Sequence, residues 1–340
     1  MSLSLKDSNI LKGVALMLLL WHHLFFSRNG MYTDFCVGKY ELAEMFARIC
    51  KLCVAIFVML SGYGLTVQAE KNGGINSIGD FYRHRFSKLL VNYWFIWLLF
   101  VPLGVLVFDR GFEEVYQTNI IPKFVADVLG LAFAFNFYGY NATWWFMSCI
   151  IVLYLGYPFL YKAVKSYPIY TLLGSVSVAI AVPAVGQHFG FLNSTMLMYL
   201  PAFVVGIILK ISPIYIEREG VGKRRLLQLI LLITFLTLWA EHLYVKANIV
   251  FDSVITVSMI MLYKSVELPR FVGNILEFLG KHSMNIFLFH TFIFSHWLKD
   301  FIYSPKNPLL IFLLLLGVCL IISVAIEWLK KLIKIDSLIK

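Results

Sequence analysis

The first apolar segment of the chain carries a lysine and a histidine at a spacing that suits chemistry. Lys12 and His23 lie eleven residues apart, or about three turns of an α-helix, so both lie on one face, about 16 Å apart along the axis. A cation at one end of this face and an imidazole at the other suit a path for an anionic ligand, with His23 as a general base. Alternatively, Lys12 anchors the helix at a membrane surface, and His22 and His23 lie in the opposite interface.

A basic run precedes another apolar segment. Arg83, His84, Arg85 and Lys88 follow one another closely in what we expect to be a loop ahead of residues 89–108. The planar fork of arginine binds phosphate oxygens in pairs, so this run suits a phosphate-bearing ligand. The same residues also suit the anchoring of a membrane helix on its cytoplasmic side, and the sequence leaves both interpretations open.

Polar side chains also lie inside apolar segments. Ser61 precedes Gly62 and Gly64, and these small residues favour close packing of helices. Ser283 and His290 are seven residues apart, roughly on one helical face. His290 lies in the middle of its segment, where snorkelling to an interface does not explain it. Ser61, Ser283 and His290 are therefore candidates for orienting groups or oxyanion donors.

The elements that must position these residues are membrane helices. Hydrophobic residues make up 60% of the 340, and charged residues only 14%, against about 45–50% and about 25% in soluble proteins. This composition excludes a soluble enzyme, a disordered chain, a collagen-like rod and a disulfide-stapled secreted domain. A spanning helix needs about 20 apolar residues, and we expect ten spans in an all-α bundle that forms one domain, residues 1–340. The expected spans are 10–27, 49–69, 89–108, 144–161, 169–186, 195–209, 226–243, 249–263, 283–298 and 308–328.

An eleventh apolar stretch, 124–138, decides the topology. It carries Asp127 and Asn136, so it could span, re-enter or lie in the interface. If it does not span and the N-terminus is cytoplasmic, 20 of the 29 Lys and Arg lie in inner segments. If it spans, every later loop changes sides, and 20 of the 29 Lys and Arg lie in outer segments instead. Because cytoplasmic loops are enriched in Lys and Arg, we expect ten spans, a re-entrant or interfacial 124–138, and both termini in the cytoplasm.

The net charge of +10 is then almost wholly cytoplasmic. A soluble protein with such a charge could bind nucleic acid, but here we expect no nucleic-acid partner. Cys50 and Cys53 form a lone pair without two further ligands at suitable spacing, so no metal site is predicted. Asn141-Ala142-Thr143 is a formal glycosylation sequon in an outer segment.

Six segments follow one another along nearly the whole chain: Lys12-Gly13 with His23, Ser61-Gly62-Tyr63, Arg83 with Arg85-x-x-Lys88, Trp145-Phe146, Tyr199–Ile207 and Leu279–His290. In this order they resemble the motifs of the acyltransferase family 3 membrane proteins. Each motif is weak alone, but their order within ten spans is fairly specific. His23, rather than His22, has the spacing of the family's Arg/Lys-x10-His helix.

The resemblance implies a membrane O-acetyltransferase with acetyl-CoA as donor and a hydroxyl of a cell-envelope glycan as acceptor. The charges fit such a donor, because Arg83, Arg85, Lys88 and Lys12 lie on the same inner face in the ten-span topology and could hold its phosphates. His23 would then act as general base or carry the acetyl group as an acyl-imidazole. The family also implies a multi-pass protein of a bacterial inner or plasma membrane. The chain ends about twelve residues after the last expected span, so transfer would finish in the membrane domain or on a separate transferase partner.

Two other classes of protein compete with this interpretation. Ten spans with buried polar groups also suit a transporter or a flippase of lipid-linked sugars. Paired repeats and Gly- or Pro-interrupted helices in corresponding halves, which transporters often show, are not apparent in the sequence. A membrane sensor or scaffold with a degenerate acyltransferase fold is a third possibility, and the retained Lys12 and His23 argue against it.

Overall fold

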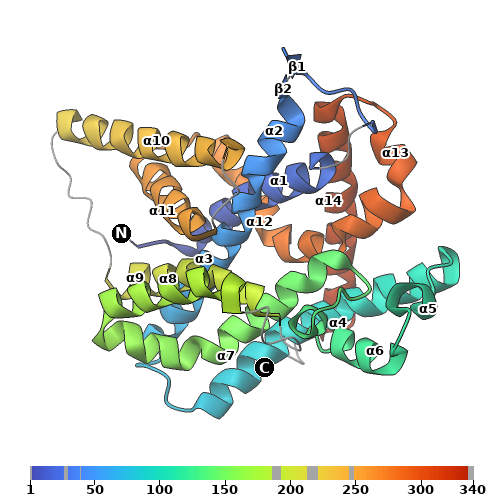
Figure 1. Cartoon of the computed structure of the whole chain (residues 1–340), viewed down its shortest axis with the longest axis horizontal. Helices are drawn as coiled ribbons and strands as arrows, with labels where there is room; N and C mark the ends of the chain where they lie inside the picture. The colour runs from blue at the N-terminus through green and yellow to red at the C-terminus, as the bar shows by residue number, and fades with distance from the viewer. Residues whose placement is uncertain are drawn as a thin grey trace.

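The computed structural model describes residues 2–26, 30–38, 40–185, 193–212, 221–244 and 249–335. These residues form a bundle of helices around α1, with one short hairpin of β1 (Cys36–Val37) and β2 (Tyr40–Glu41). Figure 1 shows α1 (Leu5–Phe25) in the interior of the bundle, next to α12 (Arg270–Thr291) and α3 (Cys53–Lys71).

The remaining elements follow in chain order. In the first half they are α2 (Leu42–Ile49), η1 (Cys50–Leu52), α4 (Ile78–Val107), α5 (Phe112–Tyr116), α6 (Ile120–Val128), η2 (Ala132–Phe135), η3 (Ala142–Trp144) and α7 (Trp145–Ser166). In the second half they are α8 (Pro168–Val185), η5 (Ser194–Tyr199), α9 (Leu200–Ile211), α10 (Val221–Tyr244), α11 (Ile249–Ser265), the π-helical η6 (Phe292–Trp297), α13 (Lys299–Tyr303) and α14 (Pro308–Leu332).

The helical architecture predicted from the sequence is confirmed, and each of the ten expected spans overlaps a helix. Within the described residues, five helical stretches are long and apolar enough to cross a membrane. Three further apolar helices are shorter: Pro168–Val182, Thr195–Ile211 and Arg225–Thr237. The chain is therefore a multi-pass membrane protein by length and composition, while the count of ten and the side of the termini stay predictions.

The start of α4 differs from the prediction. Residues 81–88 lie within this helix and not in a loop before it, because the Ser77 side chain caps the helix by accepting from the backbone N–H of Asp80 at 3.2 Å. Helical geometry then places Arg85 and Lys88, three residues apart, on neighbouring positions of one face. Arg83 falls on a different face and is exposed.

The stretch 124–138 is folded back on itself. The helix α6 ends at Val128, Gly130 has a φ of +71°, and Asn136 also adopts a left-handed conformation. Asp127 is buried within the protein, where its carboxylate accepts from the hydroxyl of Tyr116 at 2.7 Å and from the backbone N–H of Tyr140 at 2.6 Å. Because this carboxylate is satisfied by protein groups, the segment need not expose it to lipid.

Close backbone contacts at glycines fix α1 against α12. A Cβ on Gly13 would clash with the backbone of Leu276, and a Cβ on Gly280 would clash with the carbonyl oxygen of Asn9. A similar reciprocal contact joins α3 to α9, where Gly62 lies against Phe203. The expected packing role of Gly62 is thereby explained, since small residues let helix backbones approach in a membrane.

Candidate active site

A cavity of about 550 Å³ lies between α1, α3, α4, α7 and α12. We call it the cationic cavity because it collects most of the polar residues that the sequence singled out. Its lining includes Lys12, Ser61, Arg85, Lys88 and Ser283. These residues come from four helices far apart in the chain, so the fold brings together groups that the sequence could only name separately.

The positive charges of this cavity lack local counter-ions. Lys12, Arg85 and Lys88 form no ion pair with a carboxylate among the described residues, and no Asp or Glu lines the cavity. The fourth cation of the lining, Lys281, is paired with Glu277 at 2.7 Å. Arg85 also donates to the side-chain oxygen of Gln68. Three uncompensated cations in one hollow favour an anionic ligand.

A buried polar network holds one side of the cationic cavity. Asn92, which lines it, accepts from the Nζ of Lys330 at 2.9 Å. The same Nζ, on a side chain that is only 7% exposed, donates to the Oδ1 of Asn285 at 2.8 Å and pairs with Glu327 at 3.0 Å. This network ties α4 to α12 and α14, so it fixes the spacing of the helices that carry Lys88 and Ser283.

A second cavity, of about 360 Å³, extends from the cationic cavity to the turn between α3 and α4. We call it the loop cavity. Leu65 and Arg85 line both hollows, and the loop cavity continues along Asn72, Gly74 and Ser77. Arg83 lines neither of them. The arginine expected to share phosphate binding with Arg85 therefore lies apart from it, on the exposed face of α4.

A third cavity, of about 310 Å³, contains His23, and we call it the histidine cavity. The ring centroids of His23 and of His290 lie 5.1 Å apart, so α1 and the end of α12 place two imidazoles side by side. The remaining lining comes from α1, η1, α3 and α12 and from the segments around η2, η3 and η5: Leu19, His22, Lys51, Cys53, Val54, Phe133, Tyr138, Thr143, Trp145, Thr195, Met198, Tyr199 and Phe287.

The two neighbouring histidines of α1 have different surroundings. The Nδ1 of His22 lies 2.7 Å from the carbonyl oxygen of Ala47, and its ring stacks on Phe26 at 4.9 Å. A carbonyl only accepts, so this nitrogen of His22 carries the hydrogen. His23 instead turns its ring toward His290. The helix thus directs one imidazole toward α2 and the other toward α12.

The tautomer of His290 follows from its backbone contacts. Its Nδ1 lies 2.9 Å from the carbonyl oxygen of Ile286 and 3.0 Å from that of Phe287, so Nδ1 carries the hydrogen and Nε2 of the neutral ring has a lone pair. Nε2 is buried and has no hydrogen-bond partner among the described residues. A buried, unsatisfied nitrogen is costly, and such a group is a candidate for contact with a ligand.

Asn141 fixes the helix end that carries His290. Its Oδ1 accepts from the hydroxyl of Thr291 at 2.7 Å and from that of Thr143 at 2.9 Å, and its Nδ2 donates to the carbonyl oxygen of Leu288 at 3.3 Å. Asn141 is buried, so it is not available for the glycosylation that its sequon would permit. Sequence reasoning missed this role because the partners lie on a distant helix.

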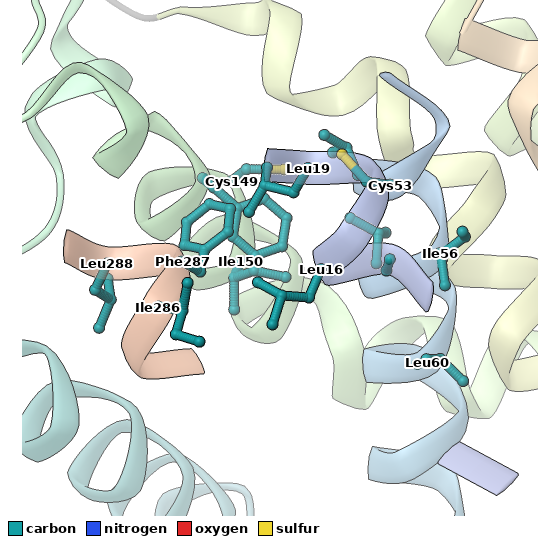
Figure 2. Close-up of a cluster of buried hydrophobic side chains, with 14 of the residues drawn as sticks. Leu16, Leu19, Cys53, Ile56, Leu60, Cys149, Ile150, Ile286, Phe287 and Leu288 are labelled. Atoms are coloured by element: carbon teal, nitrogen blue, oxygen red, sulfur yellow. The ribbon is translucent and has the colours of Figure 1, made fainter. Parts of the chain in front are cut away.

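The cationic and histidine cavities meet at one side chain. Phe287 lines both and is 5% exposed. Figure 2 shows it beside Ile150, in the packed cluster that also contains Leu16 and Leu19 of α1. Other lining residues that the sequence did not single out are Asn9, Asn92 and Tyr154. Asn92 lies four residues after Lys88, and this helical spacing was the available signal.

Comparison with known proteins gives this arrangement a chemical class. Residues 5–328 match the family model described as "Acyltransferase domain" (Acyl_transf_3). A segment of 146 residues is 27% identical to the acyltransferase MdmB of Streptomyces mycarofaciens, and it covers 41% of this chain and 36% of that protein. The chain thus matches little more than a third of that relative's length. No solved structure matches the chain.

The family match covers nearly the whole chain and includes every residue of the three cavities. It favours the acyltransferase family over the transporter and flippase classes that the sequence left open. The cations, the paired imidazoles and the helices that hold them belong to a membrane protein of acyltransferase family 3.

Proposed function

We propose that this protein is an acyltransferase that moves an acetyl group from cytoplasmic acetyl-CoA to a hydroxyl of a cell-envelope glycan, such as a capsule, an exopolysaccharide or an O-antigen. The observation that carries the proposal is that Phe287 lines both the cationic cavity and the histidine cavity. A donor with a phosphate-bearing end and a reactive thioester end needs two adjacent regions, a cationic one for the phosphates and one with a histidine for the thioester. The family membership supplies the acyl chemistry.

Donor binding follows from charge. Coenzyme A carries several phosphate charges, and Lys12, Arg85 and Lys88 face one hollow without a lining carboxylate. Arg85 also lines the loop cavity, but the carboxylate of Asp80 lines that cavity too, so the phosphates would lie around Lys12, Arg85 and Lys88 in the cationic cavity. The pantetheine arm would then extend through the cationic cavity toward Phe287, while Ser61 and Ser283 of the lining would orient it.

The expected membrane topology agrees with a donor that enters from the cytoplasm. In the ten-span topology the turn between α3 and α4 is cytoplasmic, where coenzyme A is found. The histidine cavity is lined by Lys51, Tyr138 and Thr195, which fall in or next to the outer segments of the same topology. The acceptor hydroxyl would therefore reach His23 from the outer side, and the two substrates would approach the imidazole pair from opposite faces of the membrane.

In the transfer step, His23 takes the proton of the acceptor hydroxyl while the hydroxyl oxygen attacks the thioester carbonyl. The carbon–sulfur bond breaks, coenzyme A leaves as a thiolate, and the proton on His23 passes to that sulfur. The ring of His290 lies beside that of His23, with centroids 5.1 Å apart, and would hold the ring of His23 in place by packing against it. A covalent acetyl-imidazole on His23 is the alternative route.

The test uses the purified full chain in nanodiscs with radiolabelled acetyl-CoA and a panel of bacterial envelope polysaccharides. Release of free coenzyme A thiol and label in the glycan are measured together. The expected result is acceptor-dependent thiol release with equal incorporation of acetyl, which His23→Ala abolishes. Equal incorporation by a folded His23→Ala protein overturns the assignment. Label that remains on the wild-type protein after denaturation, but not on the variant, identifies the covalent route.

A further inference from the structure

We propose that Phe287 determines which acyl groups reach the two histidines, by closing the passage between the cationic and histidine cavities to chains longer than a few carbons. This inference rests on the proposed acyl-transfer function and adds a specificity-determining residue to it. The starting observation is that Phe287 lines both cavities. A group that moves directly from the cationic cavity to the histidine cavity would pass this ring.

Three helices contribute to an aromatic cluster at this point. The ring of Phe287 lies 4.8 Å from that of Phe146 and 6.2 Å from that of Phe57, and the last two rings are 6.3 Å apart. These residues come from α12, α7 and α3. Phe57 and Phe146 also line the cationic cavity, but only Phe287 reaches the histidine cavity. Phe287 is therefore the member of the cluster at the passage itself.

Phe287 is attached to the catalytic region through its backbone and not only through its ring. Its carbonyl oxygen accepts from the Nδ1 of His290 at 3.0 Å, while the two ring centroids lie 6.3 Å apart. The backbone contact survives any substitution of the side chain by another L-residue in the helix. The ring can therefore be shortened without removing the hydrogen bond that sets the tautomer of His290.

Close aromatic packing predicts discrimination by length. An acetyl group presents one methyl to the rings, whereas each extra methylene needs space that a packed cluster does not offer. A hydrophobic site that distinguishes one methylene changes the specificity constant by about 10- to 200-fold. We expect the wild-type protein to prefer acetyl donors, and a smaller residue at position 287 to admit longer acyl chains into the enlarged passage.

The experiment compares wild type, Phe287→Ala and Phe287→Leu with acetyl-, butyryl- and hexanoyl-CoA. Phe287→Ala should raise the ratio of kcat/KM for hexanoyl-CoA to that for acetyl-CoA by at least about tenfold, and Phe287→Leu should raise it less. Phe159→Ala on α7 is the matched control, because this phenylalanine is 65% exposed. The control should keep the wild-type ratio. An unchanged ratio in both Phe287 variants overturns the proposal.

A binding measurement separates this proposal from the proposed function. Isothermal titration of the nanodisc-embedded protein with coenzyme A, acetyl-CoA and hexanoyl-CoA needs no acceptor. Phe287→Ala should bind hexanoyl-CoA about tenfold more tightly relative to acetyl-CoA than wild type does, with the affinity for coenzyme A unchanged.

Unchanged relative affinities contradict length selection even if transfer is active. Absence of transfer in wild type, together with the expected shift in affinity, contradicts only the glycan acetylation. If Phe287→Ala loses coenzyme A binding through misfolding, Phe287→Leu decides the question.

Discussion

The imidazole rings of His23 and His290 lie 5.1 Å apart, although one belongs to the first helix and the other to the end of α12. The glycine contacts between α1 and α12 bring these helices close enough for the pair to form. The backbone carbonyls of Ile286 and Phe287 fix the tautomer of His290. His290 therefore has a fixed orientation beside His23.

The first prediction separates the roles of the two adjacent histidines. His23→Gln should lower kcat by about 10² to 10⁴, the range over which a positioned general base contributes. His22→Gln is the matched control and should retain most of the activity, because Nδ1 of His22 is held by the carbonyl oxygen of Ala47, although its ring lies 5.2 Å from that of His23. Both variants should bind acetyl-CoA as wild type does. A severe loss of kcat in His22→Gln with full activity in His23→Gln would reverse the assignment.

The second prediction distinguishes two arginines of one helix. Arg85→Ala should weaken acetyl-CoA binding about tenfold or more, because a hydrogen bond to a charged group contributes about 1.5–3 kcal/mol. Arg83→Ala should change the dissociation constant little, since Arg83 lines neither the loop cavity nor the cationic cavity.

Titration of acetyl-CoA at two salt concentrations provides the measurement for both variants. The loss of acetyl-CoA affinity caused by Arg85→Ala should become smaller as the salt concentration rises, because salt screens the contact between Arg85 and the phosphates in the wild-type protein. Arg83→Ala should show no such dependence. Equal dissociation constants for the two variants would contradict the placement of the phosphates at Arg85.

The sequence predicted local properties of the chain better than tertiary ones. Apolar ranges located the helices, because a spanning helix is a local pattern. The placement of Lys12 and His23 along one face also depends only on helical spacing. The positions of Arg83 and Arg85 depend on where α4 begins, and the cap at Ser77 sets that point. A loop at this place would allow both arginines to hold phosphate, whereas a helix puts them on different faces.

The contacts that the sequence could not show join distant segments. Asn141 was visible only as part of a sequon, whereas its partners Leu288 and Thr291 lie on another helix. Phe287 was visible only as one apolar residue among many. Its importance comes from the meeting of two cavities, which depends on the packing of α3, α7 and α12.

The third prediction tests the helix contact that supports the histidine pair. Gly280→Ala should destabilise the protein by about 1–3 kcal/mol, the usual cost of overpacking, because its Cβ would clash with the backbone of Asn9. It should also lower kcat by shifting α12 and therefore His290. Gly317→Ala is the matched control, since a Cβ at Gly317 of α14 meets nothing within 4 Å.

Thermal unfolding in detergent and the acetyl-transfer rate are measured for both glycine variants. Gly317→Ala should be neutral or stabilised by up to about 1 kcal/mol, because alanine favours helix more than glycine does. Equal Tm values for wild type and Gly280→Ala would contradict the close packing of α1 on α12.

The fourth prediction concerns Asp127 in the folded-back segment between α4 and α7. Burial raises the pKa of this carboxyl from 3.8 to about 6, although Tyr140 and Tyr116 donate hydrogen bonds that oppose the shift. A raised pKa in the folded state means that the protein binds this proton more tightly when folded than when unfolded. The stability that Asp127 contributes is therefore complete below about pH 4 and is lost as the pH rises through about 6.

Two pKa units correspond to about 3 kcal/mol as an upper limit. Asp127→Asn carries a neutral amide that does not titrate, so it removes this part of the pH dependence. The apparent Tm in detergent is measured for both proteins between pH 4 and pH 7.5. The wild-type Tm should fall relative to that of Asp127→Asn as the pH rises across this range, and the difference should level off above about pH 7. Parallel curves for the two proteins would show that Asp127 keeps its ordinary pKa. The hydrogen bonds from Tyr116 and Tyr140 would then stabilise the carboxylate to the same extent as water does in the unfolded chain.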